Sequence, residues 1–155
     1  VGFKYISKLM ETVDIVAGGE EAGGMGVKNY IPERDGTMAG LLLIEMMAYR
    51  NKNILKILNE TEKQFGKFYY VRQDFHLAKR VEPKKENLPK TLLGKKVVEV
   101  KDYDGIKLIC EDSSWLMFRG SGTEPIMRTY AEAKSLAQAK KLLVLAKEII
   151  LKNGV

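Results

Sequence analysis

The 155-residue sequence has a single cysteine, a single histidine and no apolar run long enough to cross a bilayer. Because a disulfide needs two cysteines, Cys110 is predicted to be a small core residue of a protein from a reducing cytoplasm. The longest apolar segment, 38–48, is interrupted by Gly40 and Glu45, so we expect no membrane association. His76 has no companions at metal-ligand or catalytic-triad spacing, which predicts a structural role and no metal site.

Basic and acidic residues are both abundant and are interspersed along the chain. The sequence has 26 Lys and Arg against 20 Asp and Glu, for a net charge of +6. An anionic ligand fits this balance, but no basic run with interleaved aromatic residues is present. We therefore expect no nucleic-acid partner. A nucleic-acid surface is kept as one rival reading, which a steep salt dependence of binding would reveal.

The first half of the chain shows helical periodicity around a glycine-rich loop. Apolar spacing predicts a helix over 4–13, a short strand over 14–17 and then the loop at 18–24. A helix over 37–50, capped by Asp35 or Thr37, is apolar nearly all round and is predicted to be buried. A second helix over 53–65 ends at Gly66. We place a domain boundary near 67–72, which divides the chain into domains 1–68 and 69–155.

The second half has the composition of an antiparallel sheet followed by one helix. Strands at 97–101 and 106–111 are predicted to form a hairpin about Asp104-Gly105, and the charged segment 83–89 a loop with a short helix. Strand-like runs flank the loop 119–125. The last helix begins at a Ser135/Gln138 capping box and stops before Gly154. Its apolar stripe comprises Leu136, Ala139, Leu143, Ala146 and Ile150.

The loop Arg119-Gly-Ser-Gly-Thr-Glu-Pro125 has the chemistry of an anion cradle. Its glycines let backbone N–H groups approach a ligand, and Ser121 and Thr123 add hydroxyl donors. The planar guanidinium of Arg119 matches two phosphate oxygens. A Gly-Ser turn beside a solvated arginine is the simpler alternative, because such turns are common.

A second loop, Gly19-Glu-Glu-Ala-Gly-Gly24, carries two carboxylates among glycines. A carboxylate on such a loop can accept hydrogen bonds from two adjacent sugar hydroxyls. Taken alone, Glu20 could equally be a solvated loop acid.

Together these stretches resemble the α-D-phosphohexomutases, the phosphoglucomutase and phosphomannomutase superfamily. The Arg-Gly-Ser-Gly-Thr-Glu-Pro string resembles the family's phosphate-binding loop, and 19–24 is similar to its sugar-recognition loop. Gly2-Phe-Lys-Tyr5 resembles the segment whose lysine reaches the active cleft, and Glu33-Arg-Asp-Gly36 opens a helix as in the family. The resemblance implies one catalytic residue, Lys4, and six substrate-binding residues: Glu20, Arg34, Arg119, Ser121, Gly122 and Thr123.

The resemblance also implies a fold and a reaction. The chain, which begins without methionine, would be the end of a three-layer α/β third domain, followed by a small α+β fourth domain with an antiparallel sheet packed by helices (TBP-like). The intact enzyme would interconvert hexose 1-phosphate and hexose 6-phosphate through a phosphoserine and a hexose 1,6-bisphosphate, with Mg²⁺. The sequence contains neither the family's phosphoserine loop nor its Asp-x-Asp-x-Asp magnesium loop. The fragment is therefore expected to be inactive without the missing N-terminal domains.

Two positions depart from the family pattern. Ala22 replaces the serine of the sugar loop, and Tyr30 stands where a histidine often precedes the Ile-Pro-Glu-Arg-Asp-Gly segment. Losing a hydroxyl partner weakens recognition by ~1–3 kcal/mol where the site is built for it. Glucose, mannose and glucosamine phosphates therefore all stay open as substrates. A non-catalytic phosphosugar-binding module is the other rival reading.

Overall fold

The computed structural model describes residues 2–20, 22–79 and 88–152. The chain divides into two compact units, Val1–Gly66 and Lys67–Val155. In unit 1 the elements are α1 (Lys4–Thr12), β1 (Ala17–Gly19), β2 (Met25–Val27), α2 (Gly36–Arg50) and α3 (Ile54–Phe65). In unit 2 they are β3 (Tyr69–His76), β4 (Thr91–Leu92), β5 (Lys95–Lys101), β6 (Ile106–Cys110), β7 (Trp115–Gly120), β8 (Ile126–Ala133) and α4 (Leu136–Lys152).

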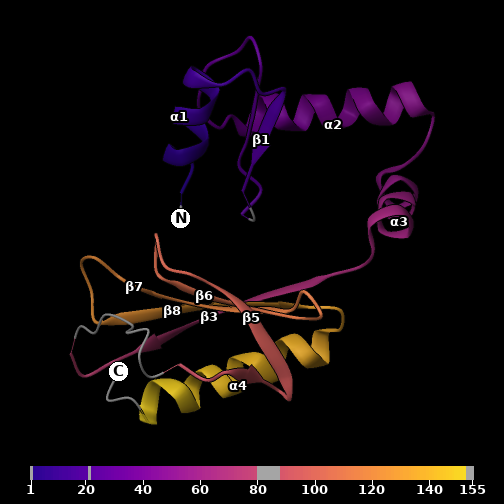
Figure 1. Ribbon diagram of the computed structural model, residues 1–155. Coiled ribbons are helices and arrows are strands. Elements are labelled where there is room, and N and C mark those ends of the chain that lie inside the picture. Colours follow the sequence, from indigo (N-terminus) through magenta and orange to yellow (C-terminus); the bar gives the residue numbers. More distant parts are fainter. Residues whose placement is uncertain (1, 21, 80–87, 153–155) are drawn as a thin grey trace. The chain divides into compact units, whose positions relative to one another are not determined.

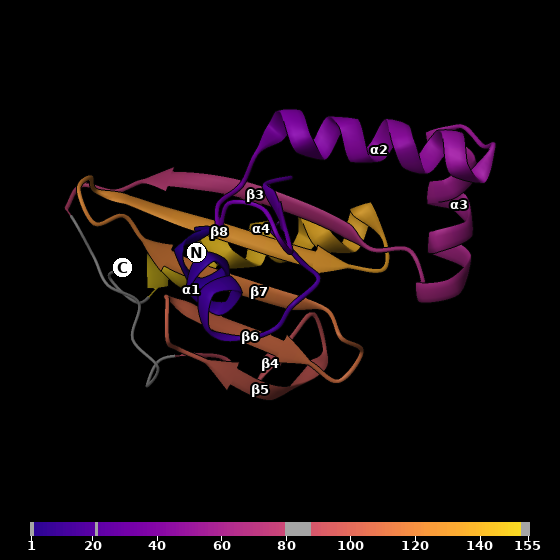
Figure 2. The same cartoon turned by 90° about the horizontal axis from the view of Figure 1, so that it is seen from above.

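Unit 2 is a six-stranded antiparallel sheet with one helix on one of its faces. The strand order is β3-β8-β7-β6-β5-β4, and Figure 2 shows this series from above. The alternation of buried and partly exposed side chains along β6 and β7 is what a sheet with one covered face requires. Helix α4 packs against β3, β7 and β8 and covers that face (Figure 1). The α+β fold class predicted for this part of the chain is confirmed.

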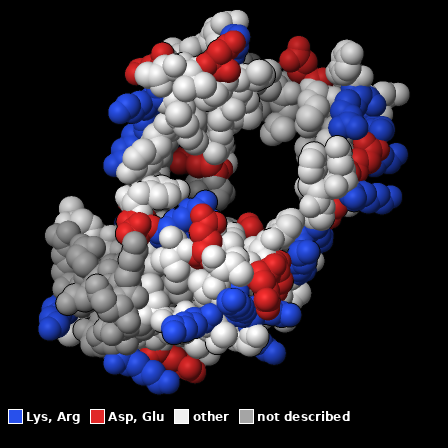
Figure 3. Space-filling model, in the orientation of Figure 1, with Lys and Arg blue, Asp and Glu red and all other residues white. Residues whose placement is uncertain are grey.

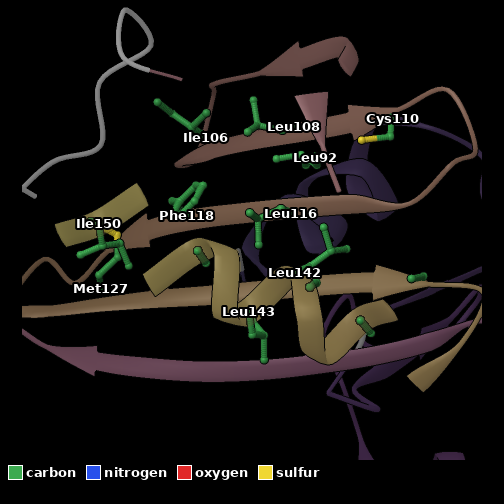
Figure 4. Close-up of a cluster of buried hydrophobic side chains, with 14 residues drawn as sticks. Leu92, Ile106, Leu108, Cys110, Leu116, Phe118, Met127, Leu142, Leu143 and Ile150 are labelled. Carbon is green, nitrogen blue, oxygen red and sulfur yellow. The ribbon is translucent and has the colours of Figure 1, made fainter. Parts of the chain in front are cut away.

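The core of unit 2 lies between α4 and the sheet. Figure 4 shows Leu142 and Leu143 of α4 among sheet residues such as Leu116, Phe118 and Met127. Leu108, Leu116 and Met127 are fully buried. Each such side chain contributes about 1.5–3 kcal/mol relative to exposure. The predicted hairpins, 97–101 with 106–111 and the two strands that flank 119–125, are present in antiparallel register.

The last helix agrees with its sequence pattern except at its first turn. Ser135 Oγ accepts from Gln138 N–H at 3.2 Å, as predicted. The Gln138 side chain donates to Asp112 Oδ2 instead of returning to the Ser135 backbone, so only half of the capping box forms. Leu136 is exposed, whereas Leu142 joins the four other stripe residues in the core. Gly154 and most of the predicted loop at 83–89 lie outside the described residues.

The described part of unit 1 contains a short hairpin, formed by β1 and β2, and three helices. The strand predicted over 14–17 is wrong by about three residues. The hairpin ladder runs from Ala17 opposite Val27 to Gly19 opposite Met25, because the tight turn at the glycines fixes the register. Asp35 caps α2 by accepting from the N–H groups of Thr37 and Met38, and Gly66 caps α3.

The predicted burial of α2 is wrong. None of its residues is buried, and Leu41 and Ile44 are exposed by 59% and 63%. Within the described residues α2 packs mainly on β2 and α3, which together are too small to cover an all-round apolar helix. On α3 only Ile57 is buried, whereas Ile54, Leu55 and Leu58 are exposed.

None of the helices within the described ranges combines the length and the apolar character that a membrane crossing requires.

Candidate functional site

The loop at 119–125 is the connection of the β7–β8 hairpin and is closed by backbone hydrogen bonds. Gly120 stands opposite Met127, and Ser121 N–H donates to Ile126 O at 2.9 Å. Pro125 O accepts from Leu77 N–H at 2.8 Å, which ties the loop to the end of β3. The hairpin therefore holds the predicted phosphate-binding residues at one end of the central strands β7 and β8.

Within the loop, Ser121 organises the backbone and the residues after it face solvent. Ser121 is 5% exposed, and its Oγ accepts from the N–H groups of Thr123 and Glu124 at 3.5 and 3.3 Å. Because these hydrogen bonds are long, both N–H groups could instead donate to a ligand oxygen that is a stronger acceptor. Gly122 and Thr123 are exposed, and a Cβ on Gly122 would meet nothing within 4 Å. The space beside the Gly122 backbone is therefore open to a ligand.

Arg119 lies at the start of this loop and is only 25% exposed along its side chain. Its Nε is 3.4 Å from Oδ1 of Asp104, in the turn between β5 and β6. The turn was predicted as a hairpin connection, but its contact with Arg119 was not.

A row of charged side chains runs from Arg119 across the sheet face opposite α4. Arg119 is the cross-strand partner of Arg128, which is in turn the partner of Asp74 on β3. Arg72 donates to both Asp74 oxygens, at 3.0 and 2.8 Å, and Arg128 Nε lies 3.9 Å from Asp74 Oδ2. The Arg72 guanidinium holds the pKa of Asp74 below its usual range.

Arg128 is the functional candidate that sequence reasoning missed. Its Nε is buried and has no hydrogen-bond partner among the described residues. Arg119 and Arg128 are cross-strand partners on β7 and β8, and each also has a carboxylate near its Nε, Asp104 at 3.4 Å and Asp74 at 3.9 Å respectively. Arg128 belongs to the strand-like run predicted after the loop, but only the register places it beside Arg119.

In unit 1, Glu20 and Arg34 are brought together at the end of the β1–β2 hairpin. Arg34 Nη1 donates to Glu20 Oε1 at 2.9 Å, and the Glu20 side chain is only 13% exposed. A Cβ on Gly24 would lie 2.6 Å from that oxygen and 3.1 Å from Arg34 Cδ. Gly24 therefore makes room for the pair, since any side chain there would displace the carboxylate.

The remaining predicted positions of unit 1 lie in different settings. Lys4 is an exposed residue of the first turn of α1, with Nζ 4.9 Å from the centre of the Tyr5 ring. Tyr30 Oη donates to Asp35 Oδ2 at 3.1 Å, which raises the pKa of Tyr30. Because Asp35 is the N-cap of α2, Tyr30 supports a helix end.

No group of three or more His, Cys, Asp or Glu among the described residues is placed to hold a metal ion. The family resemblance assigns the magnesium ligands to a loop that the sequence of this chain does not contain. On the face drawn in Figure 3, basic and acidic side chains are interspersed and form no patch of one sign.

Comparison with known proteins identifies the family. Residues 1–65 match the model of the phosphoglucomutase/phosphomannomutase alpha/beta/alpha domain III, and residues 71–148 match that of the C-terminal domain. The chain belongs to the phosphoglucomutase/phosphomannomutase family. This finding confirms the resemblance read from the sequence.

Similar proteins support the same assignment. The chain is 34% identical to a phosphoglucomutase/phosphomannomutase of Thermococcus kodakarensis over 97% of its own length and 32% of the relative's. A crystal structure from Thermus thermophilus, assigned as a phosphomannomutase, has a TM-score of 0.75 at 32% identity and is covered over 30% of its length. The open form of the Paramecium phosphoglucomutase parafusin has a TM-score of 0.69 at 26% identity. The chain spans about a third of the length of these relatives.

Proposed function

We propose that this chain is the substrate-recognition part of a phosphohexomutase and that its β7–β8 loop holds the phosphate that does not react. The observation that carries the proposal is the closed hairpin loop, which offers the Gly122 backbone beside the hydroxyls of Ser121 and Thr123. Arg119 stands at its base with Arg128 as cross-strand partner, so both positive charges would favour an anion bound at the loop.

Glu20 is proposed to accept hydrogen bonds from sugar hydroxyls. Its carboxylate is largely shielded and is held through Oε1 by Arg34. Oε2 is then the oxygen with which the carboxylate would meet a hydroxyl. Arg34, predicted as a substrate contact, would act on the sugar chiefly through Glu20. Lys4 is kept as a proposed active-cleft residue on the family resemblance alone.

For the whole protein, we propose the interconversion of hexose 1-phosphate and hexose 6-phosphate in the cytoplasm. A phosphoserine elsewhere in the protein would supply the phosphoryl group, with a hexose 1,6-bisphosphate as intermediate and Mg²⁺ stabilising the transferring charge. The residues of this chain contribute binding. Holding one phosphate remotely lets its binding energy orient the reacting end of the sugar.

The bisphosphate must turn over so that its two ends exchange places, and we propose that the junction at 66–72 permits this. Gly66 has φ of +91° and joins α3 to β3, where the two compact units meet in the sequence. Cross-linking this junction in the full-length enzyme should slow the mutase reaction. Unchanged turnover by the cross-linked enzyme would refute the hinge.

The phosphate proposal is tested by titrating the chain with inorganic phosphate, glucose 6-phosphate and mannose 6-phosphate while following backbone amide shifts. We expect the shifts to centre on 119–123. Arg119→Ala should weaken binding about 10- to 100-fold, because a charge-assisted contact is worth ~1.5–3 kcal/mol. Lys140→Ala, which removes one exposed positive charge from α4, is the matched control and should change affinity less than about twofold.

The sugar loop is tested in the same titrations. Glucose 6-phosphate should shift amides near Glu20 that inorganic phosphate does not, and Glu20→Gln should abolish these extra shifts. Glu11→Gln, at an exposed position of α1, is the matched control.

An Arg119→Ala variant that binds all three ligands as the wild-type chain does would refute the phosphate site.

A further inference from the structure

The turn between β5 and β6 is packed directly against the backbone of Arg119. Ile106 is the cross-strand partner of Phe118, so the residue before Ile106 lies beside the residue after Phe118. Gly105 has φ of +88°, and a Cβ there would lie 2.4 Å from Phe118 O and 3.2 Å from Arg119 Cα. Only glycine allows this approach without displacing the strand.

This close approach brings the Asp104 carboxylate to one edge of the Arg119 guanidinium. Asp104 Oδ1 lies 3.4 Å from Nε, and the two side chains are 19% and 25% exposed. A guanidinium carries its Nε–H group on one side and its two terminal nitrogens, Nη1 and Nη2, at the far end. An acceptor at the Nε edge restricts rotation of the group and leaves the terminal nitrogens for a bidentate contact.

We propose that Asp104 is a positioning residue, which orders Arg119 through Nε so that its terminal nitrogens are held ready for a phosphate. The proposal rests on the proposed function of the β7–β8 loop. The close packing of Gly105 supports it, since the turn fixes the carboxylate relative to the backbone of Arg119 itself. Preorganisation of this kind increases affinity by reducing the ordering that binding requires.

The opposite reading makes Asp104 a competing anion that a ligand must overcome. The two readings predict opposite changes in phosphate affinity when Asp104 is removed. If Asp104 positions Arg119, its removal weakens phosphate binding; if Asp104 competes, its removal strengthens binding, because the local field becomes more positive.

The test compares Asp104→Ala and Asp104→Asn with the wild-type chain, using inorganic phosphate as the probe. Asp104→Ala should weaken binding about tenfold, equivalent to ~1.4 kcal/mol. Asp104→Asn keeps an oxygen acceptor and should lose less, about two- to threefold. Glu99→Gln removes one negative charge from an exposed position of β5 that pairs with Lys101, and as the matched control it should not weaken binding.

Two further measurements separate positioning from a purely structural effect. In an Arg119→Ala background, Asp104→Ala should change the residual affinity less than about twofold, because its effect passes through Arg119. The Nε–H signal of Arg119 should be resolved and slow to exchange in the wild-type chain without phosphate, and should be lost in Asp104→Ala.

The outcomes are distinct. Asp104→Ala binding phosphate as tightly as wild type, or more tightly, overturns the positioning role, as does a loss that persists without Arg119. If the wild-type chain binds no phosphate, the proposed function of the loop fails. The Arg119 Nε–H signal then still decides whether Asp104 orders the guanidinium: loss of the signal in Asp104→Ala supports the ordering, and an unchanged signal overturns it.

Discussion

Replacing Gly105 by alanine should destabilise unit 2 by two separate effects. Gly105 has φ of +88°, a conformation that costs an L-residue about 1–2 kcal/mol. The added Cβ would also lie 2.4 Å from Phe118 O. Because β7 is paired on both sides, the strand has little room to move, and such overpacking costs about 1–3 kcal/mol. The expected loss in free energy of unfolding is therefore ~2–5 kcal/mol.

Gly94 provides a matched control in the same unit. It has φ of +80°, but a Cβ there would meet nothing within 4 Å. Gly94→Ala should therefore lose only the conformational part, about 1–2 kcal/mol. The difference between the two variants isolates the contact between the Asp104-Gly105 turn and β7.

Urea unfolding followed by tryptophan fluorescence measures both losses. Trp115, the single tryptophan, lies on β7, where its indole N–H donates to Glu132 Oε1 at 3.0 Å, so it reports on unit 2. Equal losses for the two variants, with unchanged m-values, would refute the close-packing argument. Gly105→Ala should also weaken phosphate binding, whereas Gly94→Ala should not.

Two other predictions concern buried and paired groups of unit 2. Thr129 is fully buried and its Oγ1 donates to a β3 carbonyl at 2.7 Å, so Thr129→Val should cost about 1–3 kcal/mol in the same urea assay. Thr129→Ser keeps the hydroxyl and controls for it. The pKa of Asp74 lies below its ordinary value of 3.8 because Arg72 donates to it, so the stability that the pair contributes is present above that value and is lost as the pH falls through the lower folded pKa. Asp74→Asn should flatten the fall in stability below about pH 4, and an unchanged pH profile would contradict this.

The parts of the fold that were predictable are those determined by neighbours along the chain. The Asp104-Gly105 hairpin, the strands around 119–125 and the last helix each follow from turn residues, alternation or capping within a short window. The loop 119–125 was recognisable as a candidate phosphate site for the same reason, because its glycines, hydroxyls and arginine are contiguous.

The neighbours of Arg119 could not be predicted in this way. Arg128 stands opposite Arg119 only because β8 pairs with β7, and Asp104 meets Arg119 only through the register of β6 on β7. Strand order and register depend on pairing between distant segments, which no local pattern specifies. The composition suggested a solvated arginine as the simple alternative, whereas the fold places Arg128 opposite Arg119 and Asp104 Oδ1 3.4 Å from its Nε.

The burial of α2 was predicted wrongly because a local sequence pattern does not specify contacts with distant segments. A helix that is apolar all round indicates that it will be covered, but the pattern does not say by what. In the described residues α2 meets only small parts of unit 1, and Leu41 and Ile44 stay exposed. The family model that matches this part of the chain is that of an alpha/beta/alpha domain. We therefore expect the rest of such a domain to supply the missing layer.

The two candidate groups differ in how far they depend on that layer. Arg119 and its loop are held by β3, β6, β7 and β8, all of which share the packed core of unit 2. Glu20 and Arg34 rest on a short hairpin in a unit whose largest helix has no buried residue. The proposed phosphate site should therefore keep its geometry in this chain alone, whereas the proposed sugar recognition by Glu20 should become more selective when unit 1 is covered. Amide shifts with inorganic phosphate, without additional sugar-dependent shifts near Glu20, would agree with this prediction. Sugar-dependent shifts that remain after the phosphate site is removed would contradict it.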